Sequence, residues 1–140
     1  MKNFKFLFIF AIFATIFAFN TSDVKAQSSP VLYFCEEYNS SLGEIGISDR
    51  FTTGYLTVMV KASSALGLSN VSIQFDKYNC RTNTFEYNKK FPYTVSPSMD
   101  YIYFAGDDLS FDSPGIYRVF LLDENNRTVA SSLIEIISKN

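Results

Sequence analysis

The sequence predicts an all-β protein, folded as an antiparallel β-sandwich of seven to nine short strands. The first observation is an alternation of apolar and polar residues with a period of two, clearest in Val71–Asp76. Such alternation suits a strand that buries one face and exposes the other. The second observation is that no segment has a convincing helical period. The third is that Pro, Gly and Asn interrupt the apolar runs at short intervals.

The first 26 residues have the features of a secretory signal peptide. A basic start at Lys2 and Lys5 is followed by an apolar run, Phe6–Phe19, and then by small residues before Gln27. We therefore expect residues 1–26 to be cleaved and residues 27–140 to form a single domain in the periplasm, on the cell surface or in the medium. No later run has 18 consecutive apolar residues, so no membrane span is expected after cleavage.

The more apolar segments, Gly54–Lys61 and Gly115–Leu122, are predicted to be central strands. Shorter segments rich in Tyr, Phe and Thr are predicted to be edge strands or connections. These are Thr84–Asn88, Tyr93–Ser96 and Asp100–Phe104, separated by breaks at Lys89–Pro92 and Ser96–Ser98.

The two ends of the domain are also predicted to be strands. Val31–Cys35 opens it, with Glu44–Ser48 as a further short strand. Ala62–Leu68 is predicted to be a loop, because it is too short to nucleate a helix alone. Glu124–Arg127 contains two Asn residues suited to the positive φ of a tight turn, and Thr128–Ile137 closes the domain.

The segment Phe111–Val119 resembles the start of the penultimate strand of bacterial extracytoplasmic immunoglobulin-like domains. In those domains an acidic turn and a Gly precede a Tyr whose hydroxyl can bond back to the turn. Gly115 and Tyr117 occupy these places, Asp112 lies one position farther from Tyr117 than in the antibody-type motif, and Val119 stands where antibody-type domains have an intersheet Cys. The resemblance implies an immunoglobulin-like sandwich in which Gly115 and Tyr117 are architectural, and it carries over no functional residue.

Two cysteines, Cys35 and Cys80, lie beyond the predicted leader. In an oxidising compartment an even pair predicts a disulfide, with two separate thiols as the alternative. No Cys-x-x-Cys spacing is present, which argues against a catalytic redox pair.

The composition narrows the possible chemistry. The chain has no His, which excludes Ser-His-Asp and Cys-His catalysis and any His-ligated metal site. The acidic residues at Asp100, Asp107, Asp108 and Asp112 are more simply explained as solvated loops than as a glycosidase pair. The Ca²⁺-loop pattern is missing. We therefore expect no enzyme activity, no metal and no cofactor.

Tyrosine is the most suggestive residue type, with nine copies in a chain that has no Trp. Tyr87 and Tyr93, and likewise Tyr101 and Tyr103, are spaced so that each pair could share one face of a strand. These four are the tentative binding residues, and half-buried sheet tyrosines are the simpler alternative. The lack of Trp favours protein over glycan as the partner. The acidic net charge of −2 argues against nucleic acid.

Together these features predict a secreted, non-catalytic binding or assembly module that contacts a cell-envelope protein through edge strands or tyrosine-rich faces. One alternative is a carboxylate-dependent enzyme that acts on a glycan. The other is a repeat subunit of an extracellular filament, with self-association through the edge strands. The leader is typical of Gram-negative bacteria, a source in which the sequons at Asn39, Asn70 and Asn126 would be incidental.

Overall fold

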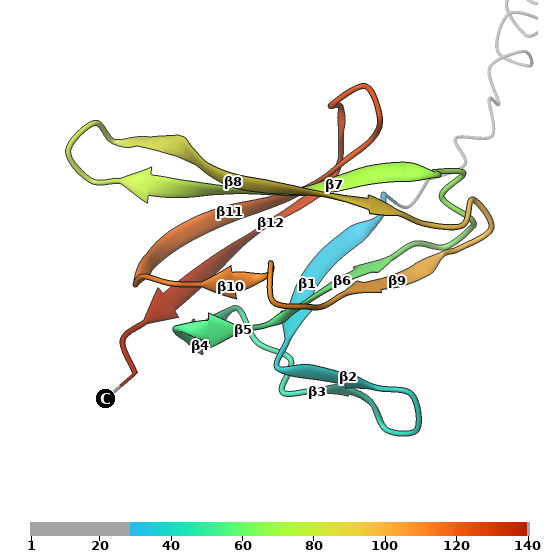
Figure 1. The fold of residues 1–140 in the computed structure, drawn as a ribbon, viewed down its shortest axis with the longest axis horizontal. Coiled ribbons are helices and arrows are strands. Elements are labelled where there is room, and N and C mark those ends of the chain that lie inside the picture. Colours follow the sequence, from blue (N-terminus) through green and yellow to red (C-terminus); the bar gives the residue numbers. More distant parts are fainter. Residues whose placement is uncertain (1–28, 140) are drawn as a thin grey trace, which may run out of the picture.

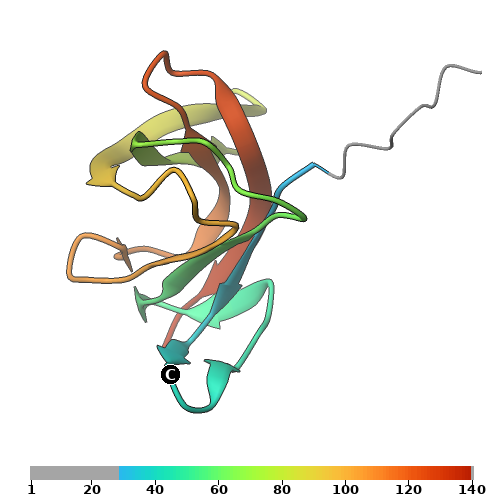
Figure 2. The same ribbon diagram turned by 90° about the vertical axis from the view of Figure 1, so that its right-hand side faces the viewer.

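A computed structural model describes residues 29–139, in which every regular element is a β-strand. The predicted signal peptide lies outside the described residues. Two sheets face one another and enclose the core (Figure 1 and Figure 2). Seven longer strands are joined by five strands of two or three residues, so the predicted all-β sandwich is confirmed.

The larger sheet has five strands in the order β4-β12-β11-β7-β8. All of its pairings are antiparallel except β4 with β12, which is parallel. The bounds are β4 Arg50–Thr52, β7 Asn70–Asn79, β8 Thr84–Thr94, β11 Gly115–Leu122 and β12 Thr128–Ile137.

The second sheet has three antiparallel strands in the order β1-β6-β9, and the short β2–β3 hairpin and the short antiparallel pair β10–β5 lie beside it. Their bounds are β1 Val31–Cys35, β2 Glu37–Asn39, β3 Gly43–Ile45, β5 Gly54–Tyr55, β6 Thr57–Lys61, β9 Tyr101–Phe104 and β10 Ser110–Phe111.

The strand order is that of an immunoglobulin-like sandwich. The chain places β1, β6 and β9 in one sheet and β7, β8, β11 and β12 in the other, as the resemblance at Phe111–Val119 implied. The predicted tyrosine contact is also present. The Tyr117 hydroxyl donates to the Ser113 carbonyl oxygen at 2.7 Å and lies 3.0 Å from the Ser113 hydroxyl.

The core lies between the sheets and is rich in rings. Phe111 packs edge-on against both Phe75 and Tyr117, with ring centroids 5.0 Å apart in each pair. Burying each such side chain stabilises the fold by about 1.5–3 kcal/mol. The principal core side chains are Leu32, Phe34, Val58, Val60, Val71, Ile73, Phe75, Ile102, Phe104, Phe111, Tyr117, Val119, Leu121, Ile134 and Ile136.

The break predicted at Lys89–Pro92 is wrong, because β8 runs through it from Thr84 to Thr94. The Val95 amide donates to the Ser69 carbonyl oxygen, and the alternation of the antiparallel ladder then points the Pro92 nitrogen away from β7. Proline is tolerated at such a position because no ladder hydrogen bond is lost.

The strand predicted at Glu44–Ser48 is shorter than expected. It ends at Ile45, where Gly46 adopts a φ of 66°, and Ser48 forms only an isolated bridge to Phe34. The predicted loop at 62–68, the break at Ser96–Ser98 and the turn before β12 are all confirmed. In that turn, Asn126 has the expected positive φ of 61°.

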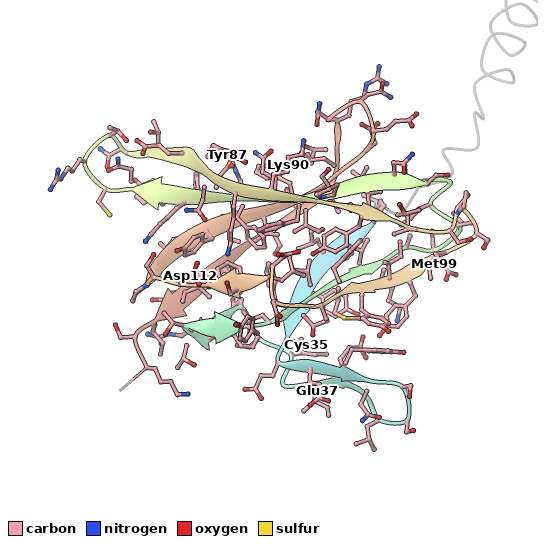
Figure 3. All side chains as sticks on the ribbon, viewed as in Figure 1. Cys35, Glu37, Tyr87, Lys90, Met99 and Asp112 are labelled. Carbon is pink, nitrogen blue, oxygen red and sulfur yellow. The ribbon has the colours of Figure 1, made fainter. Side chains whose placement is uncertain are left out.

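The predicted disulfide does not form, and both cysteines are free thiols. Cys35 is buried at the end of β1, near the β2–β3 hairpin (Figure 3). Cys80 is exposed in the β7–β8 turn, at the far left of Figure 1. Cys35 lies in the three-stranded sheet and Cys80 in a turn of the five-stranded sheet, so an even cysteine count was not sufficient to predict a bond.

Candidate functional site

Three of the four predicted binding tyrosines line one groove. Tyr101 and Tyr103 come from β9, the edge of the three-stranded sheet, and Tyr93 comes from β8 in the opposite sheet. The groove has a volume of about 380 Å³ and a largely aromatic and apolar lining. The residues that line it are Tyr38, Tyr93, Thr94, Met99, Tyr101, Ile102, Tyr103, Phe104 and Ala105.

The fourth tyrosine, Tyr87, lies elsewhere. The β7–β8 ladder has an irregularity at which Phe75 pairs with Lys89 and Asp76 with Tyr87, so Asn88 is an extra residue. Such a bulge reverses which face the following side chains occupy. Tyr87 is therefore 67% exposed on the outer side of β8 (Figure 3), whereas Tyr93 turns inward and packs on Phe104 with ring centroids 5.0 Å apart.

The backbone of β9 is open on one side. Within residues 29–139, β9 pairs with β6 alone. The Ala62 amide donates to the Asp100 carbonyl oxygen at 2.7 Å, which makes this a hydrogen-bonded pair of the antiparallel ladder. By alternation, Ile102 bonds to β6, while the amide and carbonyl groups of Tyr101 and Tyr103 point away from it. The groove therefore lies along an edge that offers backbone donors and acceptors.

The outer wall of the groove comes from the β2–β3 hairpin. The Tyr38 ring stacks on Tyr103 with centroids 4.5 Å apart and an interplanar angle of 25°. It also meets Tyr101 edge-on at 5.9 Å. Tyr103 is still 53% exposed, so its ring can accept a further contact.

A carboxylate fixes the hairpin in place. The Tyr33 hydroxyl donates to Glu44 Oε1 at 2.5 Å. Hydrogen bonds from Tyr101 and Tyr33 lower the pKa of Glu44 to about 2. Burial and the same carboxylate raise the pKa of Tyr101 to about 12, so at neutral pH the carboxylate is ionised and both phenols are neutral donors.

Sequence reasoning missed Tyr38 and Glu44. Both belong to a short hairpin whose turn is built by Asn39, whose side-chain oxygen accepts hydrogen bonds from the amides of Ser41 and Leu42. A cluster of Asn, Ser and Gly between two short segments is a hairpin signal that could have located it.

The arrangement at the groove suits binding rather than covalent chemistry. No nucleophile and base are brought together there, because the lining consists of phenols, a phenyl ring, a thioether, aliphatic groups and a threonine. Among the described residues, no group of three His, Cys, Asp or Glu side chains could hold a metal ion. Within residues 29–139, no helix is long and apolar enough to cross a membrane.

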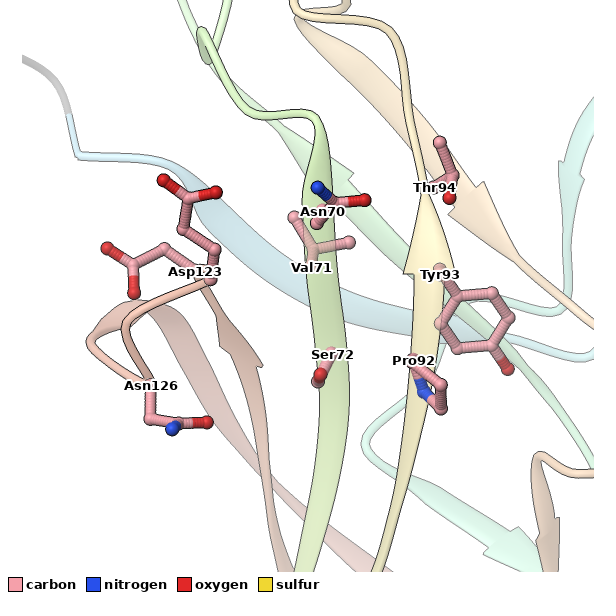
Figure 4. A pocket seen from close by; sticks show the side chains of 9 residues that line it. Asn70, Val71, Ser72, Pro92, Tyr93, Thr94, Asp123 and Asn126 are labelled. Atoms are coloured by element: carbon pink, nitrogen blue, oxygen red, sulfur yellow. The ribbon is translucent and has the colours of Figure 1, made fainter.

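Two other hollows are less suited to a partner. One of about 400 Å³ lies between the β11–β12 turn and strands β7 and β8, where Asp123 and Asn126 face Asn70 and Ser72 (Figure 4). The Asp123 carboxylate there already accepts hydrogen bonds from the turn. A wider depression of about 730 Å³ surrounds β4 and β5, where Arg50 is paired with Glu135 at 3.0 Å.

Comparisons with known proteins concern the fold. No protein family and no curated protein matches the chain. An immunoglobulin-like protein from Pseudomonas aeruginosa is similar in structure, with a TM-score of 0.48 and 12% identity over 80% of this chain and 99% of that one. Superoxide reductase (neelaredoxin) from Ignicoccus hospitalis gives a TM-score of 0.41 and 8% identity, over 78% of this chain and 80% of that one.

Proposed function

We propose that this protein is a non-catalytic, extracytoplasmic binding module that takes an extended polypeptide segment along β9 by strand addition. The observation that supports this function is the coincidence of the outward-pointing backbone groups of Tyr101 and Tyr103 with the aromatic groove beside them. In strand addition, backbone hydrogen bonds supply affinity and side-chain pockets supply selectivity.

The edge strand β8 of the five-stranded sheet differs from β9 in a way that favours β9 as the site of strand addition. Strand β8 is interrupted by a bulge at Asn88 and carries Lys89, Lys90 and Pro92. Bulges, lysines and prolines are the devices that prevent unwanted strand pairing at an edge. The four residues of β9 contain none of them.

The decisive experiment removes one backbone donor from β9. The probe is a peptide of about twelve residues, selected from a random display library against the wild-type domain. Tyr103→Pro eliminates an amide that the fold does not use, whereas Tyr103→Thr removes the ring and keeps the amide. We expect Tyr103→Pro to bind the peptide roughly tenfold more weakly than Tyr103→Thr, because one intermolecular hydrogen bond is lost.

A matched control tests the opposite edge. Lys90→Pro removes an outward-pointing amide from β8 and should leave peptide affinity unchanged. Circular dichroism of each variant verifies that the sandwich is intact. Equal affinities for Tyr103→Pro and Tyr103→Thr, or failure of the library to yield any extended binder, would overturn the proposed function.

A further inference from the structure

We propose that the β9 groove selects a segment whose apolar centre is flanked on both sides by lysine or arginine. This inference rests on the proposed function and names its ligand class. Acidic residues bracket the strand: Asp100 precedes Tyr101, and Asp107 and Asp108 follow Phe104 by three and four positions. All three are exposed. The groove between them has no charged side chain in its lining.

The spacing of these acids matches a short peptide. At about 3.3 Å per residue, the five steps from Asp100 to Ala105 cover roughly 17 Å of extended chain. Asp107 and Asp108 follow in a turn, in which the Leu109 amide donates to the Gly106 carbonyl oxygen. A paired strand of about five residues would therefore place its apolar centre over the groove and its two ends beside the acids. Asp108 lies on the β8 side, because burial and then its charge raise the pKa of Tyr93.

The nearest cations do not neutralise the negative charges of Asp100, Asp107 and Asp108. The Lys61 ammonium lies over the outer side of the Tyr101 ring, 5.9 Å from its centroid. Its charge is balanced there by Glu44, whose pKa it helps to lower. The Lys89 ammonium is directed at the Ser110 carbonyl oxygen and lies 3.7 Å from Asp112. Asp100, Asp107 and Asp108 have no ion-pair partner among the described residues.

Charge also argues against a second copy of β9 as the occupant. Residues 96–112 contain no Lys or Arg. In any antiparallel pairing of two β9 strands, Asp100 of one copy therefore approaches the segment that ends in Asp107 and Asp108 of the other, with no cation to offset the repulsion. A heterologous segment with basic flanks removes this repulsion and gains attraction at both ends.

The test uses three peptides with the same centre, Thr-Val-Thr-Val-Thr, flanked on each side by two Lys, two Ser or two Glu. Fluorescence anisotropy gives their affinities for the wild-type domain at low and high salt. We expect the Lys-flanked peptide to bind roughly tenfold more tightly than the Ser-flanked one, and the Glu-flanked peptide to bind most weakly. Added salt should reduce the difference, because the charges are exposed.

Charge variants show whether the bracketing acids cause the preference. In the triple variant Asp100→Asn, Asp107→Asn and Asp108→Asn, the preference for Lys over Ser should fall to about one, with binding of the Ser-flanked peptide kept. A control with the same change in net charge, Asp49→Asn, Glu86→Gln and Glu124→Gln, should keep the preference. These control residues are exposed and lie outside the groove.

The outcomes separate the two proposals. If all three peptides bind equally and Tyr103→Pro weakens each of them, charge selection is wrong and strand addition stands. If none of the three peptides binds while the library-selected peptide still does, charge selection is wrong and strand addition stands. A dimer of the domain that forms with increasing concentration and is abolished by Tyr103→Pro would identify a second copy as the occupant and overturn the inference.

Discussion

Tyr117 ties the start of β11 to the preceding turn. Its ring is buried against Phe111, and its hydroxyl reaches the Ser113 carbonyl oxygen at 2.7 Å. The same residue gives the clearest agreement between sequence and structure, because a Tyr two positions after Gly115 was sufficient to predict the contact. One side chain therefore fixes the angle at which the chain enters the five-stranded sheet.

The variant Tyr117→Phe tests the hydrogen bond from the Tyr117 hydroxyl to the Ser113 carbonyl oxygen. We expect a loss of about 1 kcal/mol in the free energy of unfolding, since the Ser113 carbonyl oxygen loses its hydroxyl partner while the ring packing is kept. Urea denaturation measures the change, with the exposed Tyr87→Phe as a control that should stay within error. A stability loss of the same size in both variants would contradict the assigned role.

Glu44 makes the hairpin beside the groove sensitive to acid. Because folding lowers its pKa from the ordinary value of 4.5 to about 2, its stabilising contribution is complete above pH 4.5 and is lost as the pH falls through 2. NMR should show the Tyr38 and Tyr103 ring resonances shifting together in this range. In Glu44→Gln the shifts should disappear, and their persistence would assign the transition to another group.

At the scale of elements, period-two patterning predicted strand β7 but not the course of strand β8. Val71–Asp76 alternates as a half-buried strand, and it lies within β7. Pro92 was misread because the sequence does not say which way its nitrogen points in the ladder. The extra residue at Asn88 was likewise invisible, so Tyr87 and Tyr93 were expected on one face although they lie on opposite faces.

The backbone of β9 predicts a pattern of hydrogen exchange. Amides of Ile102 and Phe104 should exchange slowly because they bond to β6, and those of Tyr101 and Tyr103 should exchange at least about tenfold faster. Saturation with a bound peptide should slow the second pair. NMR-detected exchange measures each amide. Slow exchange at Tyr103 in the unliganded domain would contradict an open edge.

At the scale of the whole molecule, the all-β sandwich predicted from the sequence is confirmed, whereas the predicted disulfide is wrong. The apolar run Gly115–Leu122 correctly indicated a central strand, since only a strand with neighbours on both sides buries so many residues. The run Gly54–Lys61 did so only for Thr57–Lys61, because Gly54 and Tyr55 form the separate short strand β5, which pairs with β10. The groove required more than local pattern, because Tyr93 and Tyr103 meet only through packing of one sheet on the other. The cysteines show the same limit of local pattern: the sequence predicted a bond between Cys35 and Cys80, and the fold leaves both as free thiols.

Thiol chemistry checks the cysteine assignment. Two thiols should titrate in denatured, unreduced protein, and a reductant should leave the thermal midpoint unchanged. In the native state only Cys80 should react quickly, because burial raises the pKa of the Cys35 thiol and the thiolate is the reactive form. A single thiol, or none, in the denatured protein would contradict the structure.

The parallel pairing of β4 with β12 has a consequence for the order of folding. Strand β12 lies between β4 and β11, so the last strand of the domain pairs with β11 across a short turn and with β4 across more than eighty residues of chain. Contacts of such separation form slowly. The part of a newly made chain that has already left the ribosome therefore cannot complete its core until Ile134 and Ile136 have been added.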